Sequence, residues 1–249
     1  MKIIKTLGWG GITVIAFLLL AINGYFIAHE ARLPAGTHTI LARYWLATFA
    51  ILLLVCLAAG YLANDRKLGI LIDGRNRISL SRVQWVLWFL VLFSAYFTGG
   101  VWDMAFGNDL PTIEPNLFGL IGISSGSAIV SSLIVETKKK EPNPKGAGDK
   151  TLLGRIDVNE KVDEAAFADL YLGEEDATRT SVDVSRLQKL ITTFLLVIVY
   201  LNMLWSAFTG ASHTYDAFDM PVVGTNFLVL LGASHAAYLA YKATPKAVP

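Results

Sequence analysis

The sequence predicts an all-α, polytopic membrane protein with six transmembrane helices, the last four of which form two copies of a helix hairpin. Three observations predict this fold. Only 16% of the 249 residues are charged and 54% are hydrophobic, whereas about a quarter of the residues in a soluble domain carry a charge. The apolar residues gather in blocks long enough to cross a bilayer, which takes about 20 residues. Short motifs then recur in the same order, more than 100 residues apart.

The apolar blocks define the expected spans. Six blocks are long enough, at about 7–28, 41–63, 83–105, 117–135, 189–208 and 222–241. The fourth and sixth are richer in small and polar residues than the others. The first block follows Lys2 and Lys5, as the apolar part of a signal peptide would. No A-x-A cleavage site follows it, so we expect an uncleaved helix. The single cysteine, Cys56, lies in the second block and excludes an internal disulfide.

The basic residues predict the orientation of these spans. With six spans, one side of the membrane receives only Arg32 and Arg43. The other side receives Lys2, Lys5, Arg66, Lys67, Arg75, Arg77, Arg82, Lys138, Lys139, Lys140, Arg186, Lys189, Lys242 and Lys246. Because short cytoplasmic loops carry the excess of Lys and Arg, we expect both termini and residues 136–188 in the cytoplasm. The chain is then a multi-pass protein of the inner (cytoplasmic) membrane, with the lipid bilayer as its first partner.

The tetrad Ser-Arg-apolar-Gln occurs twice, each time directly before an apolar block. Its serines are Ser81 and Ser185, and the matching glutamines are Gln84 and Gln188. A serine followed three residues later by Gln is typical of a capping box, in which each side chain satisfies the other residue's backbone amide. Arg82 and Arg186 would extend to the lipid headgroups. We therefore interpret the tetrads as helix caps at the membrane surface rather than as catalytic groups.

The tetrads belong to a longer repeat. Ser185 follows Ser81 by 104 residues. Five further pairs lie 110 residues apart: Asp109 and Asp219, Pro111 and Pro221, Asn116 and Asn226, Gly122 and Gly232, and Ser124 and Ser234. We expect a duplicated hairpin whose copies are related by an axis along the membrane normal, because both copies begin in the cytoplasm. The expected organisation is an N-terminal two-helix membrane hairpin (1–64), a cytoplasmic connector (65–82), a first repeat hairpin (83–135), a cytoplasmic linker with a short amphipathic helix (136–184), and a second repeat hairpin with a cytoplasmic tail (185–249).

The segments "SLSRVQWVLW", "LFGLIGISSG", "DVSRLQKLIT" and "FLVLLGASHAAYLAYK" carry a resemblance. They are similar to an uncharacterised bacterial family of multi-pass membrane proteins, in which S-R-x-Q precedes one helix and L-G-x-S lies in the next. The stretch "AAFADLYLGEE" before the second copy is also similar. The resemblance covers about 70–242 and implies some six helices and a duplication, but no activity.

Two shorter segments precede the repeats. Within 68–81, an Asp-Gly pair between apolar pieces predicts a small hairpin. After the basic, Pro/Gly-rich stretch 136–150, Phe167, Leu170 and Tyr171 are spaced as one apolar face of a two-turn helix. A helix this short is not stable alone in water. We expect it to dock either on the protein's own cytoplasmic surface or on a partner protein.

Small residues recur at equivalent positions in the fourth and sixth blocks. Gly122 and Gly126, and likewise Gly232 and Ala236, have the small-xxx-small spacing that lets helix backbones approach closely. His235 lies inside the sixth block, and an ionisable group within the membrane is a functional hypothesis by default. The alternative is a neutral imidazole bonded to a neighbouring helix. Ser125 and the other serines of the fourth block either pack in this way or line water.

The chain contains no nucleotide-binding fingerprint, zinc motif or recognisable nucleophile arrangement. We therefore expect no enzymatic activity, no cofactor, no metal site and no nucleic-acid partner. Two functions stay open. One is a membrane anchor or assembly subunit that binds a protein partner, or a second copy of itself, and recruits a larger complex through 151–184. The other is an oligomeric, passive cation pore, in which Asp109 and Asp219 form an external ring and Ser125 and His235 line the path. We favour the anchor, because it needs no pore lining.

Overall fold

The computed structural model describes residues 2–33, 41–140, 156–176, 178–214 and 217–244. In these ranges the chain is helical and forms no strand. Six α-helices follow one another: α1 (Lys2–Ala31), α2 (Ala42–Asn64), α3 (Leu80–Phe106), α4 (Pro115–Lys140), α5 (Val184–Thr214) and α6 (Thr225–Ala243). The described ranges also hold three short 3-10 turns, η1 (Gly69–Leu71), η3 (Val162–Glu164) and η4 (Phe167–Leu170). The all-α class is confirmed, while most of the predicted basic linker, at 141–150, lies outside the described residues.

Five of these helices are long and apolar enough to cross a membrane. They are Ile4–Ala31, Ala42–Asn64, Leu80–Phe106, Pro115–Lys138 and Val184–Gly210. This composition is that of a helical, multi-pass membrane protein. Helix α6 is not among the five. Asn226, His235 and Lys242 lower its hydropathy, although its 19 residues come close to the length of a span.

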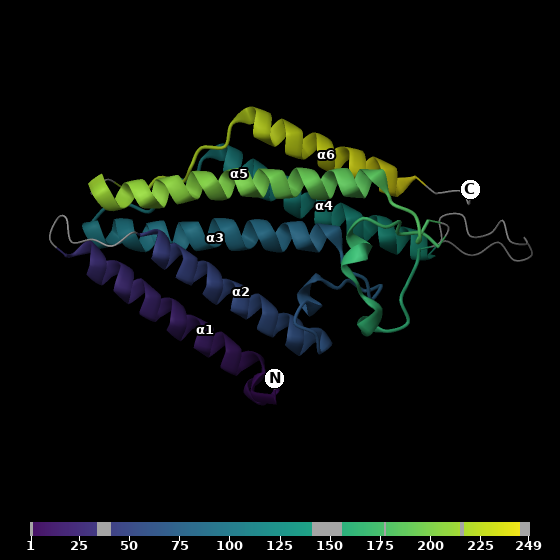
Figure 1. Ribbon diagram of the computed structural model, residues 1–249, viewed down its shortest axis with the longest axis horizontal. Coiled ribbons are helices and arrows are strands. Elements are labelled where there is room, and N and C mark those ends of the chain that lie inside the picture. Colours follow the sequence, from purple (N-terminus) through teal and green to yellow (C-terminus); the bar gives the residue numbers. More distant parts are fainter. Residues whose placement is uncertain (1, 34–40, 141–155, 177, 215–216, 245–249) are drawn as a thin grey trace, which may run out of the picture. The chain divides into compact units, whose positions relative to one another are not determined.

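The chain folds as two compact units. The first comprises Met1–Ile70, Leu87–Phe118 and Val197–Val223. Within it, α1 and α2 pack against each other as a hairpin (Figure 1). Helix α1 is interrupted at Gly8, whose φ of 60° lies in the left-handed region that glycine adopts without strain. The amide of Asn23 donates a 2.8 Å hydrogen bond to the Thr48 hydroxyl, and this hydroxyl also meets that of Thr98 at 2.9 Å.

An aromatic stack forms another part of this core. The rings of Trp45 and Phe208 lie 5.2 Å apart, and those of Phe208 and Phe218 lie 4.4 Å apart. A side chain at Gly99 would collide with the Phe218 ring, so glycine is required at this contact. The Asp103 carboxylate accepts a 2.7 Å hydrogen bond from the backbone amide of Phe218. These contacts fix the loop before α6 against α3.

The second unit comprises Leu71–Val86, Gly119–Leu196 and Gly224–Pro249. In it α4 and α6 run parallel, because successive positions of one helix meet successive positions of the other. A Cβ atom at Gly119 would lie 3.1 Å from the Leu228 side chain, and one at Gly232 would lie 3.7 Å from the Ile123 side chain. Further along, the hydroxyls of Ser131 and Tyr238 are 3.5 Å apart. This unit contains the candidate site.

Candidate functional site

A cluster of buried charges in the second unit is the candidate site. It begins at a tight turn between Ile72 and Ile78, which form an antiparallel bridge. The Asp73 amide donates to the Arg77 carbonyl at 3.0 Å, and the Asp73 carboxylate accepts from the backbone and side chain of Arg75. Asn76 takes the left-handed conformation, with φ of 55°. The hairpin predicted within 68–81 is therefore present, and it orients Arg75 and Arg77.

Segment 156–183 supplies the acidic partners. Two isolated bridges, between Ile156 and Glu175 and between Leu172 and Val182, fold the segment back on itself. Gly173 allows this fold, because a Cβ atom there would collide with Thr178. The segment is also tied to the turn before α3. Each of Asn76 and Asn159 donates a 2.9 Å hydrogen bond from its side-chain amide to the other's backbone carbonyl.

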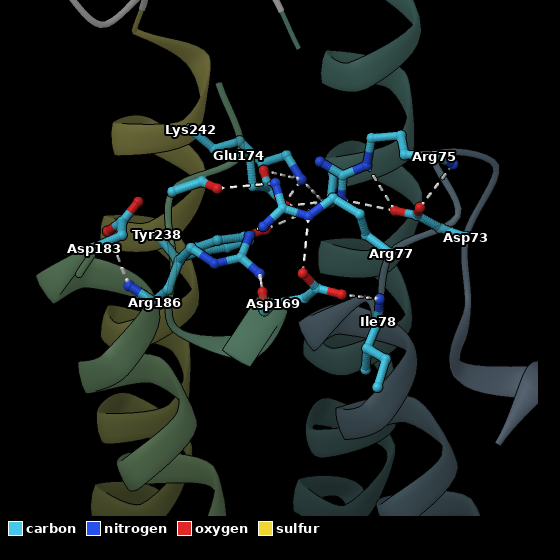
Figure 2. Close-up of polar contacts among 12 residues, drawn as sticks. Asp73, Arg75, Arg77, Ile78, Asp169, Glu174, Asp183, Arg186, Tyr238 and Lys242 are labelled. Atoms are coloured by element: carbon cyan, nitrogen blue, oxygen red, sulfur yellow. Dashed lines mark hydrogen bonds and ion pairs between the residues drawn. The ribbon is translucent and has the colours of Figure 1, made fainter. Parts of the chain in front are cut away.

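Glu174 lies at the centre of the site and pairs with three cations from three different elements (Figure 2). Arg75 Nη2 is 3.0 Å from Oε1, and Lys242 Nζ is 2.7 Å from Oε2. Arg186, at the start of α5, pairs with Oε1 as well. We call Glu174, Arg75, Arg186 and Lys242 the Glu174 cluster. None of their side chains is more than 9% exposed, so the cluster joins the turn, the segment, α5 and α6 away from water.

The charges of the cluster sustain one another. Burial alone would raise the pKa of the Glu174 carboxyl, but the positive charges of Arg186, Arg75 and Lys242 outweigh it and hold that pKa well below its ordinary value. Burial would likewise lower the pKa of the Arg75 guanidinium, but Glu174 and Asp73 raise it above its ordinary value. Both groups are therefore ionised at neutral pH. Because removing ions from water is costly, such a cluster mainly fixes geometry, and losing one member leaves an unpaired buried charge.

A second set of ion pairs lies beside the cluster. Arg77 Nε is 3.1 Å from Asp169 Oδ1, and Arg77 Nη1 is 2.9 Å from Asp157 Oδ2. The other oxygen of Asp169 accepts from the backbone amide of Ile78 at 3.0 Å. Lys138, near the end of α4, pairs with Glu175. Segment 156–183 is thus attached to the turn and to three helices by side chains that are almost all buried.

The polar contacts continue from the cluster between the helices. Lys242 Nζ also donates to the Ser131 hydroxyl at 2.7 Å and to the Tyr238 hydroxyl at 3.1 Å. Lys189 of α5 is fully buried, donates to the Ser127 hydroxyl at 3.0 Å and lies 3.9 Å from the centre of the Tyr238 ring. Two serines of α4, Ser127 and Ser131, therefore accept hydrogen bonds from lysine amines. Lys189, which was counted among the basic residues of the cytoplasmic side, lies inside the helix bundle of this unit.

The predicted helix caps need correction. Helix α3 begins earlier than expected, because the Val83 amide already bonds to the Ser79 carbonyl at 3.0 Å. Ser81 and Gln84 therefore lie inside the helix, where Gln84 donates to Thr193 and the Ser81 hydroxyl has no partner in the described part of the chain. The capping box at Ser81 is wrong. Arg82 is exposed and its guanidinium donates to the Ile72 carbonyl at 2.7 Å, so its contact with headgroups stays a prediction.

The cap of α5 is Asp183, two residues before the predicted one. Its carboxylate accepts from the amides of Ser185 at 2.9 Å and Arg186 at 3.2 Å, and from the Ser185 hydroxyl at 2.6 Å. Ser185 thus donates to the cap, and Gln188 is exposed. The prediction that Arg186 extends to lipid headgroups is also wrong, because it is 1% exposed and bonds to the Asp169 carbonyl and Glu174. A carboxylate is an equally good N-cap and suits the positive end of the helix.

Of the three residues predicted to form an amphipathic helix, Phe167 and Leu170 lie in a single 3-10 turn, η4, and Tyr171 follows directly as its C-cap. The two-turn helix is wrong, because the Asp169 carboxylate accepts from the Ala166 amide and closes the turn at its start. Leu170 is 7% exposed, whereas Phe167 is 65% and Tyr171 is 37% exposed. The segment docks on the protein itself, through Leu170 and the ion pairs. Phe167 remains open to solvent or a partner.

The predicted close packing at the small residues is wrong for two of them. A Cβ atom at Gly122 or Gly126 would meet no atom within 4 Å, so neither glycine touches another helix of the described chain. Gly232 has only an ordinary contact, and Ala236 is exposed. The tight glycine contact between α4 and α6 lies at Gly119, where a Cβ atom would be 3.1 Å from the Leu228 side chain. Sequence spacing alone does not show which face of a helix meets its neighbour.

The residues predicted for a pore are divided between the two units. Asp109 and Asp219 are exposed in loops of the first unit, where Asp219 accepts a weak 3.4 Å hydrogen bond from Thr112. In the second unit Ser125 is half-buried and His235 is 3% exposed. Neither ring nitrogen of His235 makes a hydrogen bond of good geometry to a described group.

Comparison with known proteins adds no assignment. No protein-family model, curated protein or solved structure matches the chain. Within the described ranges, no group of three or more His, Cys, Asp or Glu side chains could hold a metal ion. The site is a buried network of ion pairs that connects segment 156–183 to the start of α5 and the end of α6. The sequence signal for this site was the acidic stretch 157–176, whose negative charge is opposite to that of the basic residues at 75–77.

Proposed function

We propose that the protein is a non-enzymatic, integral inner-membrane protein that acts as a membrane anchor or assembly subunit of a larger complex. The Glu174 cluster carries this proposal. It fixes segment 156–183 to the ends of helices long enough to span a bilayer, while the Phe167 ring stays 65% exposed. A fixed segment loses little conformational freedom on binding, which favours association with a partner. Phe167 and Tyr171 would be the contacts for that partner.

The proposed topology has six spans, with both termini and segment 156–183 in the cytoplasm. The sixth span is supported by the pairing of α6 with α4. Contacts run from Gly119 with Leu228 to Ser131 with Lys242, so α6 lies beside a helix that qualifies as a span. The basic residues of the site, at the end of α6 and the start of α5, meet in one cluster. This agrees with the positive-inside rule.

The proposed duplication has structural support as well. Helix α5 begins at Val184, 104 residues after the start of α3 at Leu80, and α6 begins at Thr225, 110 residues after the start of α4 at Pro115. The contact between Ile123 and Gly232 joins positions 109 residues apart. Near-equivalent positions of two parallel helices face each other when an axis along the helices relates the copies.

The buried serines of α4 favour the anchor over a pore. Ser127 accepts a hydrogen bond from Lys189, and Ser131 accepts one from Lys242. These two hydroxyls are therefore bound to protein side chains, whereas in a water-filled pore they would face water.

The test is purification of the tagged chain from its own membranes in mild detergent, followed by measurement of the mass of the complex. We expect a stoichiometric complex with another protein, well above the 27.2 kDa of the chain. Phe167→Asp should release that protein, because a charge would replace the exposed apolar contact. Leu110→Asp is the matched control, since Leu110 is an exposed apolar side chain, 51% accessible, in the loop between α3 and α4.

Either of two results would overturn the anchor. One is a chain that purifies without a second protein species, and the other is a complex that survives Phe167→Asp unchanged. Cation flux through proteoliposomes that contain only this chain would favour the pore instead.

A further inference from the structure

Helix α5 presents an apolar face that carries one polar side chain. The face consists of Ile191, Phe194, Leu195, Ile198, Val199 and Trp205, each between 42% and 59% exposed. Asn202 lies on this same face, is exposed, and is far from both ends of the helix. Elsewhere in the described α-helices, the exposed amide side chains, those of Gln188 and Asn226, lie in the first turns.

The amide of Asn202 is only partly satisfied. Its Nδ2 donates a 2.9 Å hydrogen bond to the Ile198 carbonyl of its own helix. A side-chain amide has two donors and an acceptor oxygen, so one N–H and Oδ1 remain without a partner in the described chain. The exposed hydroxyls of Ser132 and Thr209, by contrast, satisfy their donors on their own helix backbone. Hydrocarbon offers no hydrogen bond, so an open amide facing lipid is unfavourable.

A groove lies beside this amide. It has a volume of about 320 Å³ and runs between α2 and α5 in the first unit. Its lining residues are Trp45, Leu46, Phe49, Leu201, Asn202 and Trp205. Asn202 supplies the one side-chain amide of this lining, among aromatic and aliphatic groups.

We propose that this face of α5 is the interface between two copies of the chain, with the two Asn202 amides paired across it. An amide is both donor and acceptor, so two copies related by a two-fold axis satisfy each other with reciprocal hydrogen bonds. A lipid acyl chain would fill the groove but would leave the amide open. Interhelical hydrogen bonds from Asn side chains are an established way of associating membrane helices. This inference goes beyond the proposed function, because it uses a different surface and a different partner.

Disulfide cross-linking of the full-length protein in its membrane tests the interface. The test variant is Ile198→Cys, because Ile198 lies one turn from Asn202 on the same face and is 53% exposed. The control is Ile129→Cys, because Ile129 lies on the exposed face of α4 and is 62% exposed. Under mild oxidation, Ile198→Cys should form a covalent dimer and Ile129→Cys should not. The native chain, whose single cysteine is the buried Cys56, gives the background.

The role of the amide is tested in the Ile198→Cys background. Adding Asn202→Leu should weaken dimerisation about tenfold, as expected for loss of interhelical hydrogen bonds, whereas Asn202→Gln should keep most of it. Both changes are on an exposed position, so thermal aggregation of the protomer should not change. Equal cross-linking at Ile198→Cys and Ile129→Cys, or cross-linking that is insensitive to Asn202→Leu, would overturn the proposal. Partner binding through Phe167 is measured separately, so either inference can fail without the other.

Discussion

Replacing Glu174 with glutamine should free segment 156–183 from the helices. The change keeps the shape of the side chain but removes the one charge shared by Arg75, Arg186 and Lys242. Removing one partner from a buried ion pair costs about 3–5 kcal/mol, because here Arg186 and Lys242 would stay buried without a carboxylate partner in the described chain, while Arg75 would keep Asp73. Since about 1.4 kcal/mol corresponds to a tenfold change, local opening of the segment should become roughly 100- to 4,000-fold more frequent.

Hydrogen–deuterium exchange measures this opening directly. Protected amides of the segment, such as that of Asp157, which donates to the Glu174 carbonyl at 2.9 Å, should exchange much faster in Glu174→Gln. Peptides from the α1–α2 hairpin should not change. Glu160→Gln is the control, because the Glu160 side chain is exposed. Adding Lys242→Met to Glu174→Gln should restore part of the protection by removing one unpaired cation. Exchange in Glu174→Gln within threefold of the native rate would refute the reasoning.

Three further predictions concern the charge of Glu174, the cap of α5 and two of the glycines. The folded-state pKa of Glu174 lies below its ordinary value of 4.5, so the stabilisation by its charge is complete above about pH 4.5 and is lost as the pH falls toward the folded pKa. The hydrogen-exchange rates of segment 156–183, corrected for the intrinsic effect of pH on amide exchange, should therefore be constant between about pH 7 and 5 and should rise in stronger acid. Asp183→Ala should destabilise the start of α5 by about 1 kcal/mol, measured by exchange of the first-turn amides, and Asp183→Asn should restore most of it. Gly99→Ala should lower the thermal aggregation temperature, because the added methyl group would collide with the Phe218 ring. Gly122→Ala should not lower it, because no atom lies within 4 Å of the added methyl group. Equal effects of the two substitutions would contradict the assigned contacts.

The helices were predictable because their signal is local. The length of the apolar blocks alone locates the five long apolar helices. A segment that faces hydrocarbon must satisfy its backbone hydrogen bonds within itself, and an α-helix does so. The hairpin between Ile72 and Ile78 was also predictable, because an Asp-Gly turn between apolar residues is a short-range pattern.

The ionic site was not predictable in the same way, because its pairs are distant in sequence. Arg75 and Glu174 are 99 residues apart, and Arg186 was interpreted as a residue that reaches lipid headgroups. The positive-inside rule counts charges but does not say whether each meets lipid, water or a carboxylate. The cap of α5 shows a related limit. Asp183 and Ser185 are both good N-cap residues, and only the backbone geometry decides between them.

The glycines show a third limit. Gly119 and Gly122 lie three residues apart on α4, so they are neighbours on the surface of this helix, and the spacing motif favoured Gly122. Of these two glycines, Gly119 lies close to the Leu228 side chain of α6, whereas a Cβ atom at Gly122 would meet no atom within 4 Å. A motif that recurs within one sequence identifies repeated positions but does not identify the face that packs.

The most direct test of the anchor is the location of segment 156–183 relative to the membrane. Phe167→Cys and Asp109→Cys would each be treated with a membrane-impermeant maleimide in sealed vesicles of known orientation; Phe167 and Asp109 are both exposed, and the native Cys56 is buried. We predict that Phe167→Cys reacts only from the cytoplasmic side and Asp109→Cys only from the opposite side. Reaction of both from the same side would contradict the claim that membrane-spanning helices present segment 156–183 to a cytoplasmic partner.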